Sequence, residues 1–100
     1  MFWKFPFAKW FAPRKNGLYI VKHQGKVKHI GIAFKTETGK NIKQQVKYHY
    51  NNEKSKITWM HDNKDMTSIK YIPMENFEEA KTKREAMYEV YKKRVKRYEY

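Results

Sequence analysis

Residues 26–50 have the sequence KVKHIGIAFKTETGKNIKQQVKYHY, and the pattern within them determines most of the predicted fold. Apolar side chains recur in it with period two on both sides of a turn-forming segment, Glu37-Thr38-Gly39. Such alternation is typical of strands with one buried face, and Gly39 can adopt the positive φ that a three-residue hairpin loop requires. The pattern predicts a central antiparallel hairpin that pairs Phe34 with Ile42. Its buried positions are Ile30, Ile32, Phe34, Ile42, Val46 and Tyr48.

The opposite face of the predicted hairpin is polar and basic, and Gly31 with Ala33 leaves room there for a ligand backbone to approach. Ordinary solvent faces mix charges of both signs, whereas this face and the strand ends beside it meet almost no acids. A surface with one sign of charge indicates a polyanionic ligand. We predict that nucleic acid is bound by Lys26, Lys28, His29, Lys35, Lys43, Gln45, Lys47 and His49.

Three further segments alternate in the same way, residues 18–22, 55–60 and 67–72, and complete a five-stranded meander. We expect His23-Gln24-Gly25 to turn the first strand into the second, with Leu18 paired to Ile30 and Val27 on the face of Tyr19. The sheet is then apolar on both faces at this end. An N-terminal arm and a C-terminal helix are the segments left to cover those faces.

The N-terminal arm, residues 1–16, interleaves aromatic and basic side chains, and Pro6 and Pro13 prevent one long helix. Our preferred interpretation is that the aromatic side chains pack against an open sheet face or a barrel end. Two alternatives stay open: a base-stacking arm, and an interfacial membrane anchor, which the prolines and the lack of a helical period oppose. The aromatic residues are Phe2, Trp3, Phe5, Phe7, Trp10 and Phe11.

A C-terminal helix is predicted to begin after Asn76, because Asn76-Phe77-Glu78-Glu79 has the form of a capping box. An apolar stripe at three- and four-residue steps continues from there to Tyr98, broken by Arg84. Such a helix would be about 33 Å long, longer than the strands, so its last turns should extend past the sheet. They carry a second candidate nucleic-acid-binding cluster: Lys92, Lys93, Arg94, Lys96 and Arg97.

Together these elements predict one α+β domain, with the arm at 1–16, an antiparallel sheet at 17–73 and an amphipathic helix at 74–100. The sheet is expected to be a five-stranded meander or a small SH3-like barrel. In the order of its short strands and helix, the chain resembles small chromatin-type β-barrels of the SH3-like class.

Composition narrows the class of protein further. The chain has 100 residues, a formal net charge of +13 and 17% aromatic residues, and its mean hydropathy is −1.04. Thirteen of the 23 lysines and arginines lie in residues 1–61, where the acids are Glu37 and Glu53. The absence of cysteine excludes disulfides and thiolate metal sites. The apolar N-terminal stretch is too short to span a membrane and lacks a signal-peptide cleavage site, so we expect a cytoplasmic protein.

Catalytic and metal-binding patterns were sought and give no candidate. His29 and His49 should lie diagonally on the solvated sheet face without a carboxylate to complete a metal site. His61-Asp62 in a turn could supply a base and its orienting group, but turn residues of this kind are common. No phosphate-binding glycine loop or nucleophile motif occurs. We therefore expect no enzyme, no metal, no cofactor and no small-molecule substrate.

The function predicted from the sequence is phosphate-directed binding of DNA or RNA with little base specificity. Lysine outnumbers arginine among the basic residues, and lysine binds phosphates as a point charge rather than reading base edges. The alternative is a small inhibitor of phage type whose basic face binds an acidic surface of a host protein. The Lys-, Asn- and Tyr-rich composition permits a phage origin, and a membrane surface is not an expected partner.

Overall fold

The computed structural model describes residues 2–51 and 67–91. In chain order these residues form β1 (Trp3–Lys4), α1 (Phe5–Phe11), β2 (Gly17–His23), β3 (Lys26–Ala33), α2 (Ile42–Asn51), β4 (Thr67–Pro73) and α4 (Phe77–Tyr91). The expected α+β class, the antiparallel sheet and the C-terminal helix are confirmed.

The sheet differs from the expected meander. Its four described strands lie in the order β1-β4-β2-β3, and every neighbouring pair is antiparallel. The predicted strands at 18–22 and 67–72 are present, whereas the one at 55–60 lies outside the described residues. Five strands and an SH3-like barrel are not confirmed.

The predicted central hairpin of residues 26–50 is wrong in its second half. Residues Ile42–Asn51 form helix α2, so Phe34 does not pair with Ile42. Ile42, Gln45, Val46 and His49 are its buried residues, and they recur at the three- and four-residue steps of one helix face. Ile42 and Val46 fit both periods, since four residues are two strand repeats and about one helical turn.

The β2–β3 hairpin forms, but its register is two residues from the predicted one. Leu18 pairs with Ile32 rather than with Ile30. The turn consists of Gln24 and Gly25, with φ of 53° and 78°, as a two-residue type I′ turn requires. An irregularity after Val21 moves Val27 into the cluster of Ile20 and Ile30, away from the predicted face of Tyr19. The two-residue loop therefore accounts for one residue of the difference in register, and the irregularity after Val21 accounts for the other.

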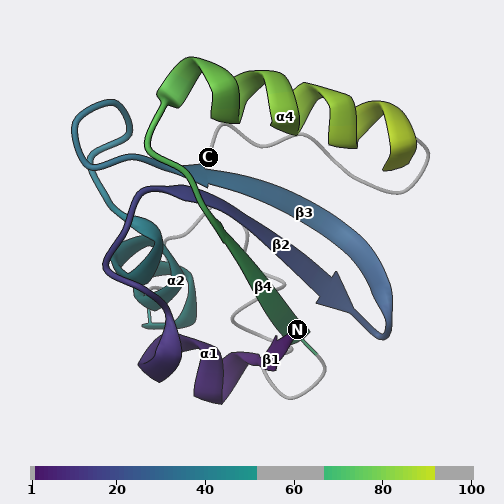
Figure 1. Ribbon diagram of the computed structural model, residues 1–100. Helices are drawn as coiled ribbons and strands as arrows, with labels where there is room; N and C mark the ends of the chain where they lie inside the picture. Colours follow the sequence, from purple (N-terminus) through teal and green to yellow (C-terminus); the bar gives the residue numbers. More distant parts are fainter. Residues whose placement is uncertain (1, 52–66, 92–100) are drawn as a thin grey trace.

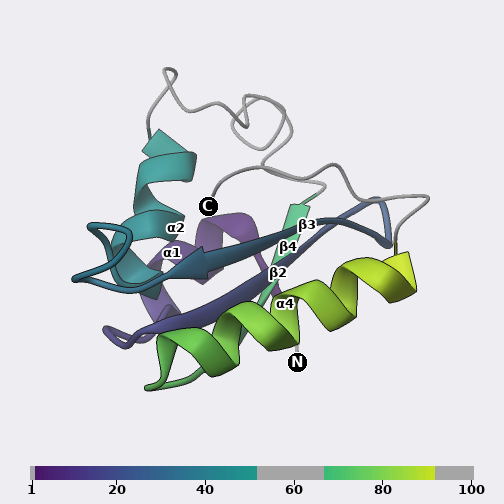
Figure 2. The same cartoon turned by 90° about the horizontal axis from the view of Figure 1, so that it is seen from above.

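Both faces of the sheet are covered by helices, as the double-sided apolarity predicted. Figure 1 shows α4 along one face and α1 with α2 along the other, and Figure 2 shows the same layers from above. One core joins Tyr19, Val21 and Ile69 to both helices of the second layer. On the opposite face, Leu18 and Ile32 pack with Ala80 of α4. The N-terminal arm and the C-terminal helix thus cover opposite faces, with α2 assisting the arm.

The arm itself contains a short helix, α1, which the prolines did not lead us to expect. Pro6 lies in its first turn, where a missing backbone N–H costs nothing. Phe5, Ala8 and Ala12 are buried against the sheet, and the Tyr71 hydroxyl donates a hydrogen bond to the Ala8 carbonyl at 2.6 Å. Among the aromatic side chains of α1, Phe5 packs into the core, whereas Phe7, Trp10 and Phe11 face solvent.

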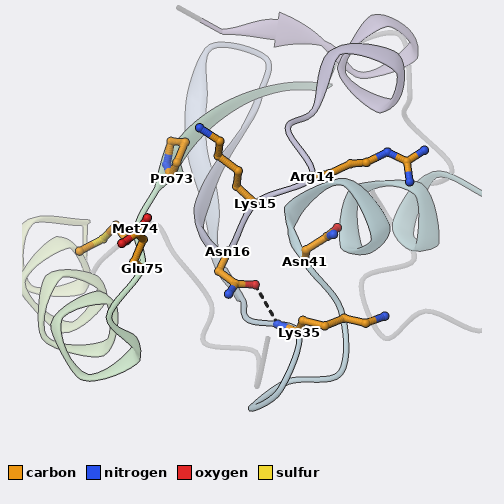
Figure 3. Close-up of a pocket in the computed structure, with 8 residues that line it drawn as sticks. All are labelled: Arg14, Lys15, Asn16, Lys35, Asn41, Pro73, Met74 and Glu75. Carbon is orange, nitrogen blue, oxygen red and sulfur yellow. Dashed lines mark hydrogen bonds between the residues drawn. The ribbon is translucent and has the colours of Figure 1, made fainter.

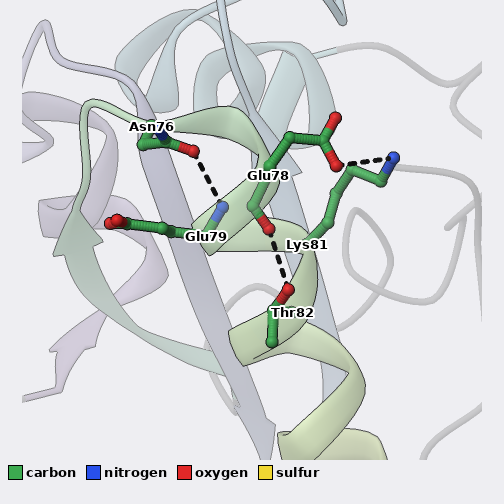
Figure 4. Close-up of polar contacts among 5 residues, drawn as sticks. All are labelled: Asn76, Glu78, Glu79, Lys81 and Thr82. Carbon is green, nitrogen blue, oxygen red and sulfur yellow. Dashed lines mark hydrogen bonds and ion pairs between the residues drawn. The ribbon is translucent and has the colours of Figure 1, made fainter.

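Helix α4 begins where the capping box predicted. The Asn76 side chain accepts a hydrogen bond from the Glu79 backbone N–H at 2.9 Å, as Figure 4 shows. Ala80 and Tyr88 are buried, and the Tyr88 hydroxyl donates to the Ile30 carbonyl at 3.0 Å. The predicted extension toward Tyr98 lies outside the described residues.

Candidate nucleic-acid interface

The predicted binding face of the sheet is not a surface. His29, Gln45 and His49 are buried, because α2 lies over the strand positions that were expected to face solvent. The space at Gly31 is also filled, since a Cβ atom built there would overlap the ring of Tyr19. These three polar residues cannot touch a ligand as they were predicted to do.

Two of the buried polar residues, Gln45 and His49, instead form a hydrogen-bonded cluster with Tyr19 between the sheet and α2. His49 Nε2 lies 2.9 Å from the Tyr19 hydroxyl and 3.0 Å from the Gln45 amide nitrogen. An amide nitrogen can only donate, so His49 Nε2 accepts, the Tyr19 hydroxyl also donates to it, and the ring proton lies on Nδ1. The His29 ring lies edge-on to that of Tyr19, with centroids 5.6 Å apart.

Burial shifts the proton affinities in this cluster toward the neutral forms. Burial, and secondarily the positive charge of Lys40, lowers the pKa of His49 to about 4. Burial also raises the pKa of Tyr19 far above its usual value, opposed by the hydrogen bond with Gln45. Both groups are therefore neutral near pH 7, and the cluster helps to pack α2 against the sheet.

Three lysines of the predicted face, Lys35, Lys43 and Lys47, lie on α2 and on the loop before it and are wholly or partly exposed. Lys43 Nζ donates to the Trp10 carbonyl at 2.7 Å, and Lys35 Nζ donates to Gln44 Oε1 at 3.3 Å. Lys40 Nζ lies 4.5 Å from the ring centroid of Tyr48, a cation–π distance. Lys47 is exposed one turn after Lys43.

A cavity of about 570 Å³ lies beside the start of α2. Figure 3 shows residues from four chain segments around it, and the Lys35 backbone N–H donates to the Asn16 side chain at 2.9 Å. Three of the lining side chains are cationic and one is acidic. The lining residues are Arg14, Lys15, Asn16, Lys35, Asn41, Pro73, Met74 and Glu75.

Backbone hydrogen bonds explain why these segments meet. The first N–H groups of α2 donate to the loop that follows α1, from Ile42 to the Lys15 carbonyl at 2.9 Å and from Lys43 to the Pro13 carbonyl at 3.2 Å. These donors are thereby used within the protein. Side-chain cations rather than helix N–H groups are left to bind an anion here.

We call the resulting area the cationic surface. It consists of Arg14, Lys15, Lys35, Lys40, Lys43 and Lys47. Sequence reasoning found Lys35, Lys43 and Lys47 but missed the other three. The signal for α2 was present in Asn41-Ile42-Lys43-Gln44, a capping box that the strand pattern obscured.

The other predicted binding residues are not brought to this surface. Lys26 and Lys28 lie at the turn end of the β2–β3 hairpin, whereas the cavity lies beside Gly17, at the opposite end of β2. Lys92, Lys93, Arg94, Lys96 and Arg97 lie outside the described residues.

Helix α4, in the opposite layer, has a mixed charge pattern. Its described cations are Lys81, Lys83 and Arg84, and its acids are Glu78, Glu79, Glu85 and Glu89. Lys81 forms an ion pair with Glu78 at 3.6 Å, drawn in Figure 4. The described protein thus has one cationic layer and one of mixed charge.

Other kinds of site were also sought in residues 2–51 and 67–91. Within these ranges, no three histidine, aspartate or glutamate side chains gather closely enough to hold a metal ion. None of the helices formed by these residues is both long and apolar enough to cross a membrane. Comparisons with models of protein families, with curated protein sequences and with solved structures return no match. Fold and surface alone therefore define the class, a small basic α+β protein with an antiparallel sheet between two helical layers.

Proposed function

We propose that this protein binds nucleic acid through its phosphates, with little dependence on base sequence, at the cationic surface around α2. The observation that carries the proposal is the convergence of the loop after α1, the loop after β3 and the start of α2 on one cavity. The first loop lines it with Arg14 and Lys15 and the second with Lys35, whereas the start of α2 contributes Asn41, and Glu75 is the one acid among the cavity's lining residues. An excess of positive charge, here over the acids Glu37 and Glu75, raises the local concentration of a polyanion, the more so at a concave site.

The kind of cation favours phosphates over bases. Arg14 is the one arginine of the cationic surface, and the other five members are lysines. Lysine is a hydrated point charge suited to phosphate oxygens, whereas base edges are read mainly by bidentate arginine, asparagine or glutamine. Contacts of this kind position a protein on nucleic acid without specifying sequence. The proposal is one of binding alone, without a chemical step.

The test compares two double variants that remove the same charge from opposite layers. Lys35→Gln with Lys47→Gln changes the cationic surface, and Lys81→Gln with Lys83→Gln changes α4. Affinity for a labelled oligonucleotide would be measured between about 50 and about 200 mM salt. The first variant should bind several-fold more weakly and reduce the slope of log affinity against log salt by about one to two units. The α4 variant should bind nearly as the unmodified protein does.

Two results would overturn the proposal. Equal effects of both double variants would mean that net charge, rather than this surface, holds the ligand. Absence of binding to duplex DNA, single strands and RNA even at low salt would leave the acidic protein partner as the better explanation.

A further inference from the structure

Helix α1 presents three large aromatic side chains to solvent. Phe7, Trp10 and Phe11 are 56%, 65% and 59% exposed. They lie at steps of three and four residues, which places them on one side of the helix. Scattered exposed apolar residues are ordinary, whereas large apolar side chains grouped on one side of an element are typical of an interaction site. Phe5 and Ala8, on the other side of α1, supply the burial that holds the helix to the sheet.

The aromatic face is joined directly to the cationic surface. Lys43 Nζ hydrogen-bonds to the Trp10 carbonyl at 2.7 Å, which places a cation of α2 at the end of α1 that carries Trp10. Arg14 follows α1 by three residues and lines the cavity. A ligand that touches Trp10 therefore has cations within reach on the path toward the cavity.

We propose that the nucleic acid bound by this protein is single-stranded, with unpaired bases stacked on Trp10 and Phe7 while the phosphates follow Arg14, Lys43 and Lys47. This inference rests on the proposed function and narrows its ligand. Bases of a duplex are stacked on each other and present only their edges, so an exposed ring gains nothing from them. Unpaired bases offer a ring face, and the stacking is tolerant of sequence.

Phe11 has a supporting part in this arrangement. Its ring is already stacked with that of Trp3, with centroids 5.0 Å apart and planes inclined by 30°. Since Trp3 belongs to β1, this stack ties the solvent side of α1 to the edge of the sheet. We assign the bases to Trp10 and Phe7 on the exposure of their side chains.

An anionic membrane surface would also suit aromatic side chains beside lysines. The cavity argues for a strand instead. A flat bilayer can reach only the convex side of α1, whereas a flexible strand can bend from Trp10 past Arg14 into a concave site.

The test uses three ligands with matched phosphate content: a single strand, the same strand without bases, and a duplex. Trp10→Ala should weaken binding of the single strand about ten-fold and leave the abasic strand and the duplex unchanged. Phe7→Ala should act in the same direction. Val90→Ala is the matched control, because Val90 is a 76% exposed apolar residue on α4; it should change nothing. Circular dichroism verifies folding, and Trp10→Phe should restore most of the affinity.

Fluorescence gives an independent measurement. With Trp3→Phe and Trp59→Phe, Trp10 is the remaining tryptophan, and the single strand but not the abasic strand should quench its emission.

If both strands bind equally and Trp10→Ala is neutral while duplex still binds, this inference fails and phosphate binding stands. If Trp10→Ala abolishes binding to phosphatidylglycerol vesicles yet spares the single strand, α1 is a membrane contact and the inference is overturned. If no nucleic acid binds at low salt, the proposed function fails with it.

Discussion

The Tyr19 hydroxyl lies 2.9 Å from Nε2 of His49, a contact that ties the central strand β2 to helix α2. Both side chains are buried. The hydrogen bond between them gives the Tyr19 hydroxyl and the His49 ring nitrogen a partner, without which burying these polar atoms would be costly. The contact fixes the rotation of α2 on the sheet. With His49 and Gln45 turned inward, Lys43 and Lys47 are left on the outer side.

Stability should depend on pH through His49. The pKa of His49 is about 4 in the folded protein and about 6.5 in an unfolded chain. Above pH 6.5 the group is neutral in both states. As the pH falls from there toward 4, the unfolded chain takes up a proton that the folded protein excludes, so stability is lost progressively, by about 3 kcal/mol at most.

Urea unfolding at a series of pH values measures this loss. Carboxylates titrate in the lower part of the same range, so the comparison is with His49→Gln, which retains them. The variant should be less stable at neutral pH and should lose less stability on acidification. Parallel pH profiles for the two proteins would show that His49 takes up its proton without disturbing the fold.

Gly31→Ala should destabilise the protein by about 1–3 kcal/mol, because the new methyl group overlaps the Tyr19 ring on the paired strand. Gly31 has no positive φ, so backbone strain does not contribute. A double-mutant cycle with Tyr19→Leu, measured by chemical denaturation, tests whether Tyr19 is the residue that the new methyl group overlaps. The alanine should cost clearly less in the Tyr19→Leu background, whereas full additivity would contradict the packing described.

The capping box of α2 should be worth about 1 kcal/mol. The Gln44 backbone N–H donates to Asn41 Oδ1 at 2.9 Å, and the Asn41 backbone N–H donates to Gln44 Oε1 at 3.0 Å. Asn41→Ala should therefore lower the free energy of unfolding by about that amount. Lys83→Ala, at an exposed position of α4, should stay within about 0.5 kcal/mol. An Asn41→Ala effect as small as that of the control would mean that the docked loop alone holds the start of α2.

The N-terminal cap of α4 offers the corresponding test in the other layer. Asn76→Ala should cost about 1 kcal/mol in thermal or urea unfolding, because it removes the bond from the Glu79 N–H. The same substitution should leave nucleic-acid affinity unchanged, since α4 lies across the sheet from the cationic surface. A loss of affinity without a loss of stability would place α4 in the interface.

Local signals predicted the β2–β3 hairpin and the start of α4, because alternation, a glycine turn and a capping box each act within a few residues. The segment that became α2 was mistaken because Ile42 and Val46 suit either period. Its capping box was the better signal, since Asn41 and Gln44 satisfy helix-end donors that a strand does not have. Which basic residues gather could not be predicted, because Arg14 and Lys35 are brought together by contacts between distant segments: the docking of α2 onto the loop after α1 and the hydrogen bond from the Lys35 N–H to Asn16.

The position of the bound ligand on the protein can be mapped residue by residue, which tests the cationic surface as the interface. Amide chemical shifts of ¹⁵N-labelled protein would be followed by NMR during titration with a short single-stranded oligonucleotide at low salt. We expect the largest shifts at Arg14, Lys15, Lys35 and the first turns of α2, with α4 little changed. Shifts concentrated on Phe77–Tyr91, or none at all at saturating ligand, would contradict a nucleic-acid interface at the cationic surface.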